Sequence, residues 1–148
     1  MTARRKSGSK IGRGMLALCG AYQLALGTYF MLLRPSFLPE DLRFIGSSAA
    51  VLKATAPGLE TWLQWVFAVL GGQMAGVGLL VLLAATGDRR GIVSSMTGMT
   101  LLILVAATTT ALMSAANFAI GSDFRFALVA PIALWIIALL FYWKSATP

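Results

Sequence analysis

The sequence predicts an all-α integral membrane protein, folded as an antiparallel four-helix bundle in a single membrane domain, residues 1–148. Three observations predict this fold class. Of the 148 residues, 58% are hydrophobic and only 11% are charged, whereas a soluble domain carries about 25% charged residues. The apolar residues form long uninterrupted blocks instead of alternating with polar residues. Lys and Arg gather on one side of these blocks, as they do in membrane proteins.

Four blocks free of charge are long enough to cross the hydrocarbon core, which takes about 20 helical residues. They predict spans at about residues 14–33, 62–86, 92–118 and 124–143, the last of which begins two residues before its charge-free block and so includes Arg125 at its outer end. In lipid every backbone amide must be satisfied within its own segment, so we expect these blocks to be helices. A membrane β-barrel would alternate polar and apolar residues, and the blocks do not.

The connections between the spans differ in length. Residues 87–91 and 121–123 form short connections, which make consecutive helices antiparallel neighbours. Residues 34–60 form a longer outer segment, where Pro39 and two acidic residues suit a first helical turn. Apolar residues then recur at helical spacing. We expect an amphipathic helix on the outer membrane surface; the alternative is an ordered loop with one helical turn.

The basic residues predict that both termini are cytoplasmic. In this orientation the cytoplasmic side carries eight Lys and Arg side chains against one Asp, and the outer side carries four against four acidic residues. The positive-inside rule assigns the basic side to the cytoplasm. Residues 1–10 are expected to be a flexible basic cytoplasmic tail, attracted to anionic lipid by about 1 kcal/mol per charge. A cleaved signal peptide is disfavoured, because no small-x-small site follows the first block.

Several kinds of chemistry are disfavoured by composition. The chain has no histidine and one cysteine, Cys19, so we expect no histidine metal site, no haem and no internal disulfide. The four apolar blocks contain no charged residue, although proton-coupled transport depends on charged residues within the membrane. We therefore expect no metal and no cofactor. Nucleic acid is not an expected partner either, because the basic tail has neither aromatic nor folded support.

Neutral polar residues near the middle of the spans are the first candidate ligand site. Gln23, Gln73 and Thr108 lie at similar depths in the first three blocks. Amides and hydroxyls in a dry bundle can orient the polar group of a small ligand or lipid. The alternative is that they hydrogen-bond one helix to another, which is worth only about 0.6 kcal/mol on average.

A second candidate site lies at the outer end of the third span. Asn117, Asp123 and Arg125 could line a pocket together with the outer segment. The alternative is a local ion pair between Asp123 and Arg125 at the membrane interface. Catalysis through Asp123 or Glu40 with Arg125 is the least favoured hypothesis, because a lone exposed carboxylate has no evident cause for a tuned pKa. A protein without enzymatic activity is therefore expected.

Small residues predict close helix packing in the second span. Ala68, Gly72 and Gly76 recur every four residues, and Gly72-x-x-x-Gly76 matches the small-x-x-x-small pattern that lets helix backbones approach. This face could meet another span of the same chain or a partner subunit.

Two stretches resemble small uncharacterised bacterial membrane proteins with four helices: Arg34-Pro35 with Leu38-Pro39-Glu40-Asp41, and Asn117-Phe118 through Asp123-Phe124-Arg125. The resemblance implies a multi-pass protein of the bacterial inner (plasma) membrane and brings no known activity. With the packing faces, the sequence predicts a non-enzymatic subunit or scaffold of a membrane complex. Its partners would be membrane lipids and other subunits or further copies of itself. The alternative is a binder or carrier of a small apolar or lipid-like ligand within the bundle.

Overall fold

The computed structural model describes residues 2–86 and 96–146, and all regular elements in these ranges are helices. The all-α prediction is therefore confirmed for this part of the chain. The elements are α1 (Thr2–Leu32), α2 (Pro39–Ile45), α3 (Ala49–Thr55), α4 (Leu59–Thr86), α5 (Met96–Val105), the π-helix η2 (Ala106–Ala111), α6 (Leu112–Ala119) and α7 (Val129–Ala146).

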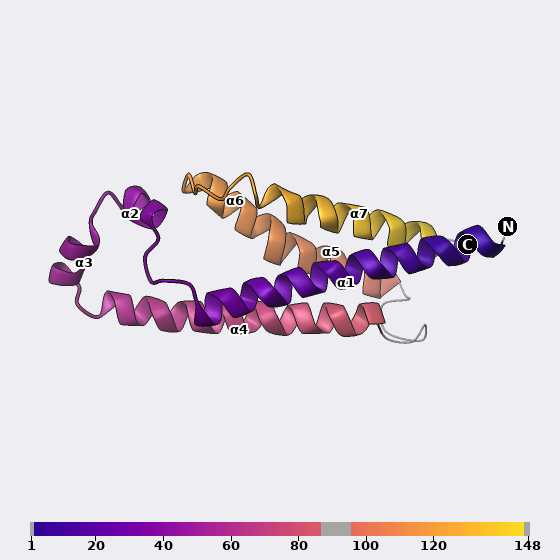
Figure 1. The fold of residues 1–148 in the computed structure, drawn as a ribbon, viewed down its shortest axis with the longest axis horizontal. Coiled ribbons are helices and arrows are strands. Elements are labelled where there is room, and N and C mark those ends of the chain that lie inside the picture. Colours follow the sequence, from indigo (N-terminus) through magenta and orange to yellow (C-terminus); the bar gives the residue numbers. More distant parts are fainter. Residues whose placement is uncertain (1, 87–95, 147–148) are drawn as a thin grey trace.

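The long helices lie side by side, with α1 between α4 and α7 (Figure 1). The start of α1 and the ends of α4 and α7 lie together at one end of the molecule, which we call the tail end. At the opposite end, α2 and α3 lie beyond the helices; we call residues 34–58 the outer cap and this end the cap end.

Three helical segments within the described ranges are long and apolar enough to cross a membrane, namely Lys10–Leu32, Leu59–Thr86 and Thr100–Ala119. They agree with the first three predicted spans. In the fourth predicted span, Val129–Phe141 is apolar but shorter. The predicted turn at residues 87–91 lies outside the described residues.

Two predicted segments differ from the structure. Residues 2–10, expected to be a flexible tail, form the first turns of α1. The outer segment holds two short helices where one amphipathic helix was expected. Gly46 ends α2 in the left-handed region at φ 70°, which favours glycine. Ser48 then caps α3, because its side chain accepts a hydrogen bond from the Val51 backbone N–H at 3.3 Å.

The contact between α1 and α4 is so close that glycine is required on both helices. A Cβ atom placed on Gly20 would lie 2.8 Å from the Leu82 backbone nitrogen, and one on Gly71 would lie 2.5 Å from the Gly27 carbonyl oxygen. A Cβ on Gly27 or Gly78 would also overlap backbone atoms of the facing helix. We call Gly20, Gly27, Gly71 and Gly78 the glycine seam.

The glycine seam lies on a different face of α4 from the packing face selected from the sequence. Gly72 and Gly76 are exposed, and a Cβ on either would meet no heavy atom within 4 Å. Ala68 is half-buried. The contact between the two helices therefore repeats every seven residues, at Gly71 and Gly78, and the four-residue pattern lies on another face of α4.

Arg13 joins α1 to the tail end of α4. Its Nε donates a hydrogen bond to the Ala85 carbonyl oxygen at 2.9 Å, and its Nη2 donates one to the Thr86 carbonyl oxygen at 3.1 Å. The last carbonyls of a helix have no partner within the helix, and they attract positive charge. Arg13 therefore caps α4 from the neighbouring helix.

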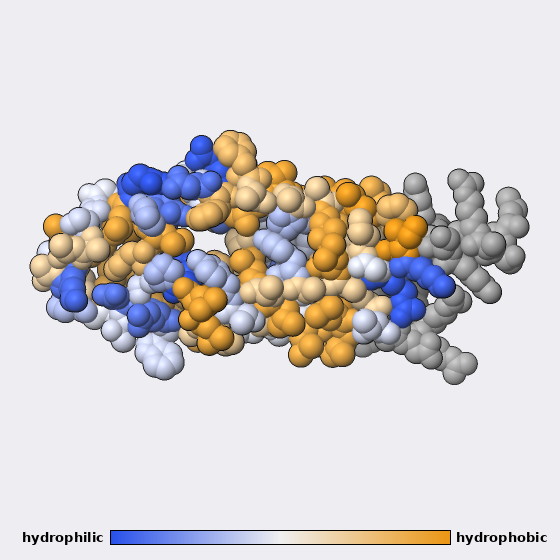
Figure 2. All heavy atoms as spheres, in the orientation of Figure 1, coloured by the Kyte–Doolittle hydropathy of each residue, from blue (hydrophilic) through white to orange (hydrophobic). Residues whose placement is uncertain are grey.

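A hydrophobic core near the tail end joins four helices. Its buried residues come from α1, α4, α5 and α7, namely Leu16, Cys19, Val81, Ala85, Leu102, Trp135 and Ala138. Elsewhere large apolar side chains cover the outside of the helices (Figure 2). Exposed apolar surface of this extent is typical of a protein that faces lipid or a partner.

The glycine seam predicts opposite effects for two Gly→Ala substitutions in α4. Gly78→Ala forces a methyl group into the backbone of α1 and should destabilise the fold by about 1–3 kcal/mol. The matched control Gly76→Ala meets open space and should be neutral or slightly stabilising, since Ala favours helix. Thermal unfolding of the purified protein in detergent measures both. Equal losses in the two variants would contradict the seam.

Candidate functional site

Two buried side chains in the bundle have polar atoms without a hydrogen-bond partner among the described residues. Gln23 of α1 is 1% exposed, and neither its Oε1 nor its Nε2 is hydrogen-bonded. Trp135 of α7 is 2% exposed, and its indole Nε1 is also unpaired. A buried donor or acceptor left unpaired costs about 1–3 kcal/mol. Such groups are rare in proteins and indicate a site that a polar molecule could occupy.

Helix register places these groups within about one helical turn of one another in the bundle. Trp135 packs in the core with Cys19 of α1, and Ala106 of η2 packs against the same core. Gln23 follows Cys19 by four residues, and Thr110 follows Ala106 by four. Both therefore lie about one helical turn closer to the cap end, on the same faces as the residues around Trp135.

Thr110 completes this layer from the third helical segment. It is 1% exposed, and its Oγ1 lies 3.5 Å from the Oγ1 of Thr109. We call Gln23, Thr110 and Trp135 the interior polar layer. It consists of one amide, one hydroxyl and one indole N–H, which together can donate and accept hydrogen bonds.

The interior polar layer includes a residue of a π-helix. Across η2 the Leu112 N–H bonds to the Ala107 carbonyl, five residues back. Threonine hydroxyls bond to the carbonyls that precede this wide turn: Thr108 to Leu104 at 2.8 Å and Thr109 to Val105 at 2.6 Å. Single π-turns within α-helices occur frequently at functional sites.

The structure does not bring together the three mid-span residues selected from the sequence. Gln23 is buried, but Gln73 is exposed on α4 and Thr108 is exposed with its hydroxyl on its own helix. Sequence reasoning did not identify Trp135. The available signal was its position in the middle of an apolar block, away from the membrane interfaces where Trp is enriched.

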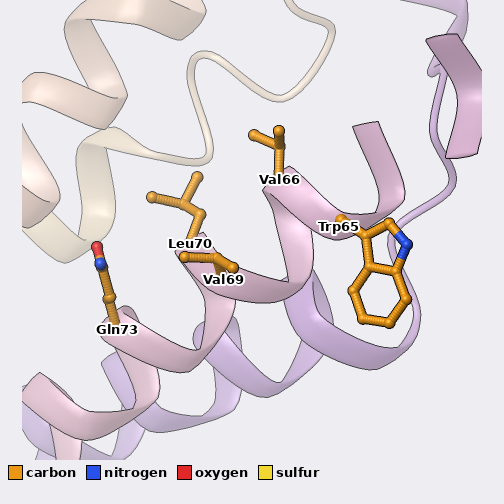
Figure 3. A pocket seen from close by; sticks show the side chains of 5 residues that line it. All are labelled: Trp65, Val66, Val69, Leu70 and Gln73. Carbon is orange, nitrogen blue, oxygen red and sulfur yellow. The ribbon is translucent and has the colours of Figure 1, made fainter. Parts of the chain in front are cut away.

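Gln73 belongs to a different feature, an open apolar groove along α4. The groove has a volume of about 410 Å³ and is lined by Trp65, Val66, Val69, Leu70 and Gln73. In Figure 3 the Val66, Leu70 and Gln73 side chains point to the same side of α4, away from α1. No hydrogen bond within the described part of the chain engages the Gln73 amide.

The outer cap is tied to the cap ends of α1 and α4. The Arg34 Nη2 lies 3.0 Å from Asp41 Oδ2, and its guanidinium carbon lies 3.7 Å from the centre of the Phe67 ring of α4. Ser36 Oγ donates to the Glu60 carbonyl at 3.1 Å. The Arg34 side chain thus joins an ion pair to a cation–π contact.

The outer cap also contacts the connection between α6 and α7. Glu40 is 3% exposed, and its Oε1 accepts a hydrogen bond from Ser122 Oγ at 3.2 Å. Arg43 Nη2 donates to Asp123 Oδ1 at 2.8 Å, in an exposed pair. This hydrogen bond raises the pKa of Arg43. We call the Glu40–Ser122 and Arg43–Asp123 contacts the cap latch.

The polar residues predicted to line a pocket here have separate partners, and the alternative of an ion pair between Asp123 and Arg125 is replaced by the cap latch. Asp123 pairs with Arg43 of the outer cap, while Arg125 Nη1 donates to the Gly121 and Ser122 carbonyls at 3.1 and 3.3 Å. Asn117 donates to the Met113 carbonyl of its own helix at 2.9 Å. Asn117, Asp123 and Arg125 therefore use their polar groups separately, and the buried acid in this region is Glu40.

No protein-family model, curated protein or solved structure matches this chain. The resemblance to small bacterial four-helix membrane proteins therefore stays a prediction.

The two contacts of the cap latch should contribute unequally. Glu40→Ala removes the acceptor to which the buried Ser122 hydroxyl donates and should lower the free energy of unfolding by about 1–3 kcal/mol. Asp123→Asn weakens a solvent-exposed pair, so its effect should be smaller and should vanish in high salt. Thermal unfolding at low and high salt measures both variants. A larger loss for Asp123→Asn than for Glu40→Ala would refute this order.

Proposed function

We propose that this chain is a non-enzymatic multi-pass membrane protein that serves as a subunit or scaffold of a membrane assembly. The observation that carries the proposal is the exposed Gln73 amide. It lies near the middle of the 28-residue apolar helix α4 and points away from α1. Hydrocarbon offers this amide no hydrogen bond, so a partner helix with a polar group at the same depth would stabilise it.

The neighbouring small residues favour a partner that packs closely. Gly72 and Gly76 are exposed beside Gln73, and a Cβ added to either would meet no other part of the described chain within 4 Å. Backbones can approach closely where such residues meet, and interhelical hydrogen bonds strengthen the contact. A second copy of the chain would supply both features, since one Gln73 amide can donate to another and accept from it.

A four-span topology in the bacterial inner membrane is part of this proposal. The 18-residue α7 would be the fourth span, next to the three longer apolar segments. In Figure 1 the start of α1 and the end of α7 lie at the same end of the molecule, which supports placing both termini on one side. The excess of Lys and Arg at this end favours the cytoplasm.

The open groove on α4 supports a second candidate function, the binding of a lipid-like ligand. Trp65, Val66, Val69 and Leu70 would contact an apolar chain, and Gln73 would hold a polar group of the ligand. The groove has a volume of about 410 Å³ and is open along its length. In this second candidate function the Gln73 amide bonds to a ligand, whereas in the first it bonds to a partner helix.

Gln73→Leu distinguishes the two candidates when compared with Thr108→Val as a matched control. Both substitutions remove an exposed polar group from the middle of an apolar helix, but the Thr108 hydroxyl already bonds to its own helix. The subunit proposal predicts that Gln73→Leu reduces cross-linked or copurified assemblies at least several-fold, and that Thr108→Val does not. The measurements are cross-linking in native membranes and native mass spectrometry from mild detergent.

Other outcomes of this experiment separate the candidates. Loss of a bound lipid in Gln73→Leu, with the assembly mass unchanged, would support the groove ligand and exclude the subunit role of Gln73. A wild-type monomer with neither partner nor bound lipid would overturn both.

A further inference from the structure

We propose that the interior polar layer is a binding site for a single water molecule, held between the Gln23 amide, the Trp135 indole and the Thr110 hydroxyl. The site is separate from Gln73 and the α4 groove, so the proposal does not rest on the proposed function. It concerns what joins α1, η2 and α7 at the middle of the molecule.

The chemistry of the unpaired atoms points to a ligand that both donates and accepts. Gln23 offers two N–H donors and one acceptor oxygen, and Trp135 offers one N–H donor. A direct contact from Trp135 Nε1 to Gln23 Oε1 would leave the Gln23 N–H donors unpaired. Water can accept from the indole and from the amide, and it can donate to Oε1 or to the Thr110 oxygen. Buried waters typically make about three such hydrogen bonds.

The burial of the layer favours water over a larger ligand. Gln23 and Thr110 are each 1% exposed and Trp135 is 2% exposed. The open groove on α4 has no lining residue in common with this layer. The layer adjoins the apolar core residues Leu16 and Cys19, which supply no strong hydrogen-bonding group. The acceptors and donors of Gln23 must therefore be matched by a small molecule within the layer.

Water-edited solid-state NMR in lipid bilayers tests this site. The chain has four Trp residues, and Trp62 and Trp65 are exposed at the cap end of α4, so they serve as internal references. We expect magnetisation from water to reach the Trp135 indole much faster than the backbone amide of buried Ala138. In Gln23→Leu, which keeps the side-chain size but removes the amide, this transfer should slow several-fold. Gln64→Leu, the same substitution at an exposed position of α4, is the matched control and should leave the transfer unchanged.

The other possible results either overturn or support the water site. Transfer to Trp135 no faster than to Ala138, or transfer unaffected by Gln23→Leu, would overturn the proposal. Correlations from lipid protons to Trp135 that disappear in Gln23→Leu would replace water by a lipid group. If Gln23→Leu fails to fold, the transfer of magnetisation from water to the Gln23 side-chain amide can be measured in Trp135→Phe instead. Continued rapid transfer from water to that amide supports the site, and its absence refutes it.

Discussion

The close approach of the α1 and α4 backbones is the constraint on which the rest of the structure depends. Four glycines make it possible, two on each helix and seven residues apart. In lipid there is little hydrophobic drive between apolar helices, so van der Waals contact along a smooth seam is a main source of association. Because the seam fixes one face of α4 against α1, the opposite face, with Gln73, is directed outward.

The two sides of α1 meet their neighbours by different means. Towards α4 the contact is backbone against backbone, and the Arg13 cap reinforces it at the tail end. Towards α7 the contact combines the apolar core around Trp135 with the polar layer that contains Gln23. The first contact has no space for side-chain rearrangement, whereas the second includes polar groups that can exchange partners.

The helical class and the long apolar helices could be predicted because hydropathy over about 20 residues reports directly on the surrounding medium. The sequence did not show which face of each helix packs against its neighbour. In α4 both the face towards α1 and the face towards lipid are apolar, so Gly72-Gly76 and Gly71-Gly78 are equally good candidates from composition. The pair Arg43–Asp123 joins residues 80 positions apart, and no local pattern predicts it. Gln23 was identifiable as a mid-span amide, but its relation to Trp135 and Thr110 needed the helix register.

The outer cap has a mechanical consequence. Arg13 holds α1 against α4 at the tail end, and the Ser36–Glu60 contact holds the outer cap against the start of α4. The segment α5–α7 packs against α1 and α4 through the apolar core near the tail end. At the cap end the same segment is held to the outer cap by the Glu40–Ser122 and Arg43–Asp123 contacts. Loss of the cap latch contacts would let α5–α7 rotate about the apolar core, which would act as a hinge. The molecule would then widen at the cap end only, and the tail end would stay closed.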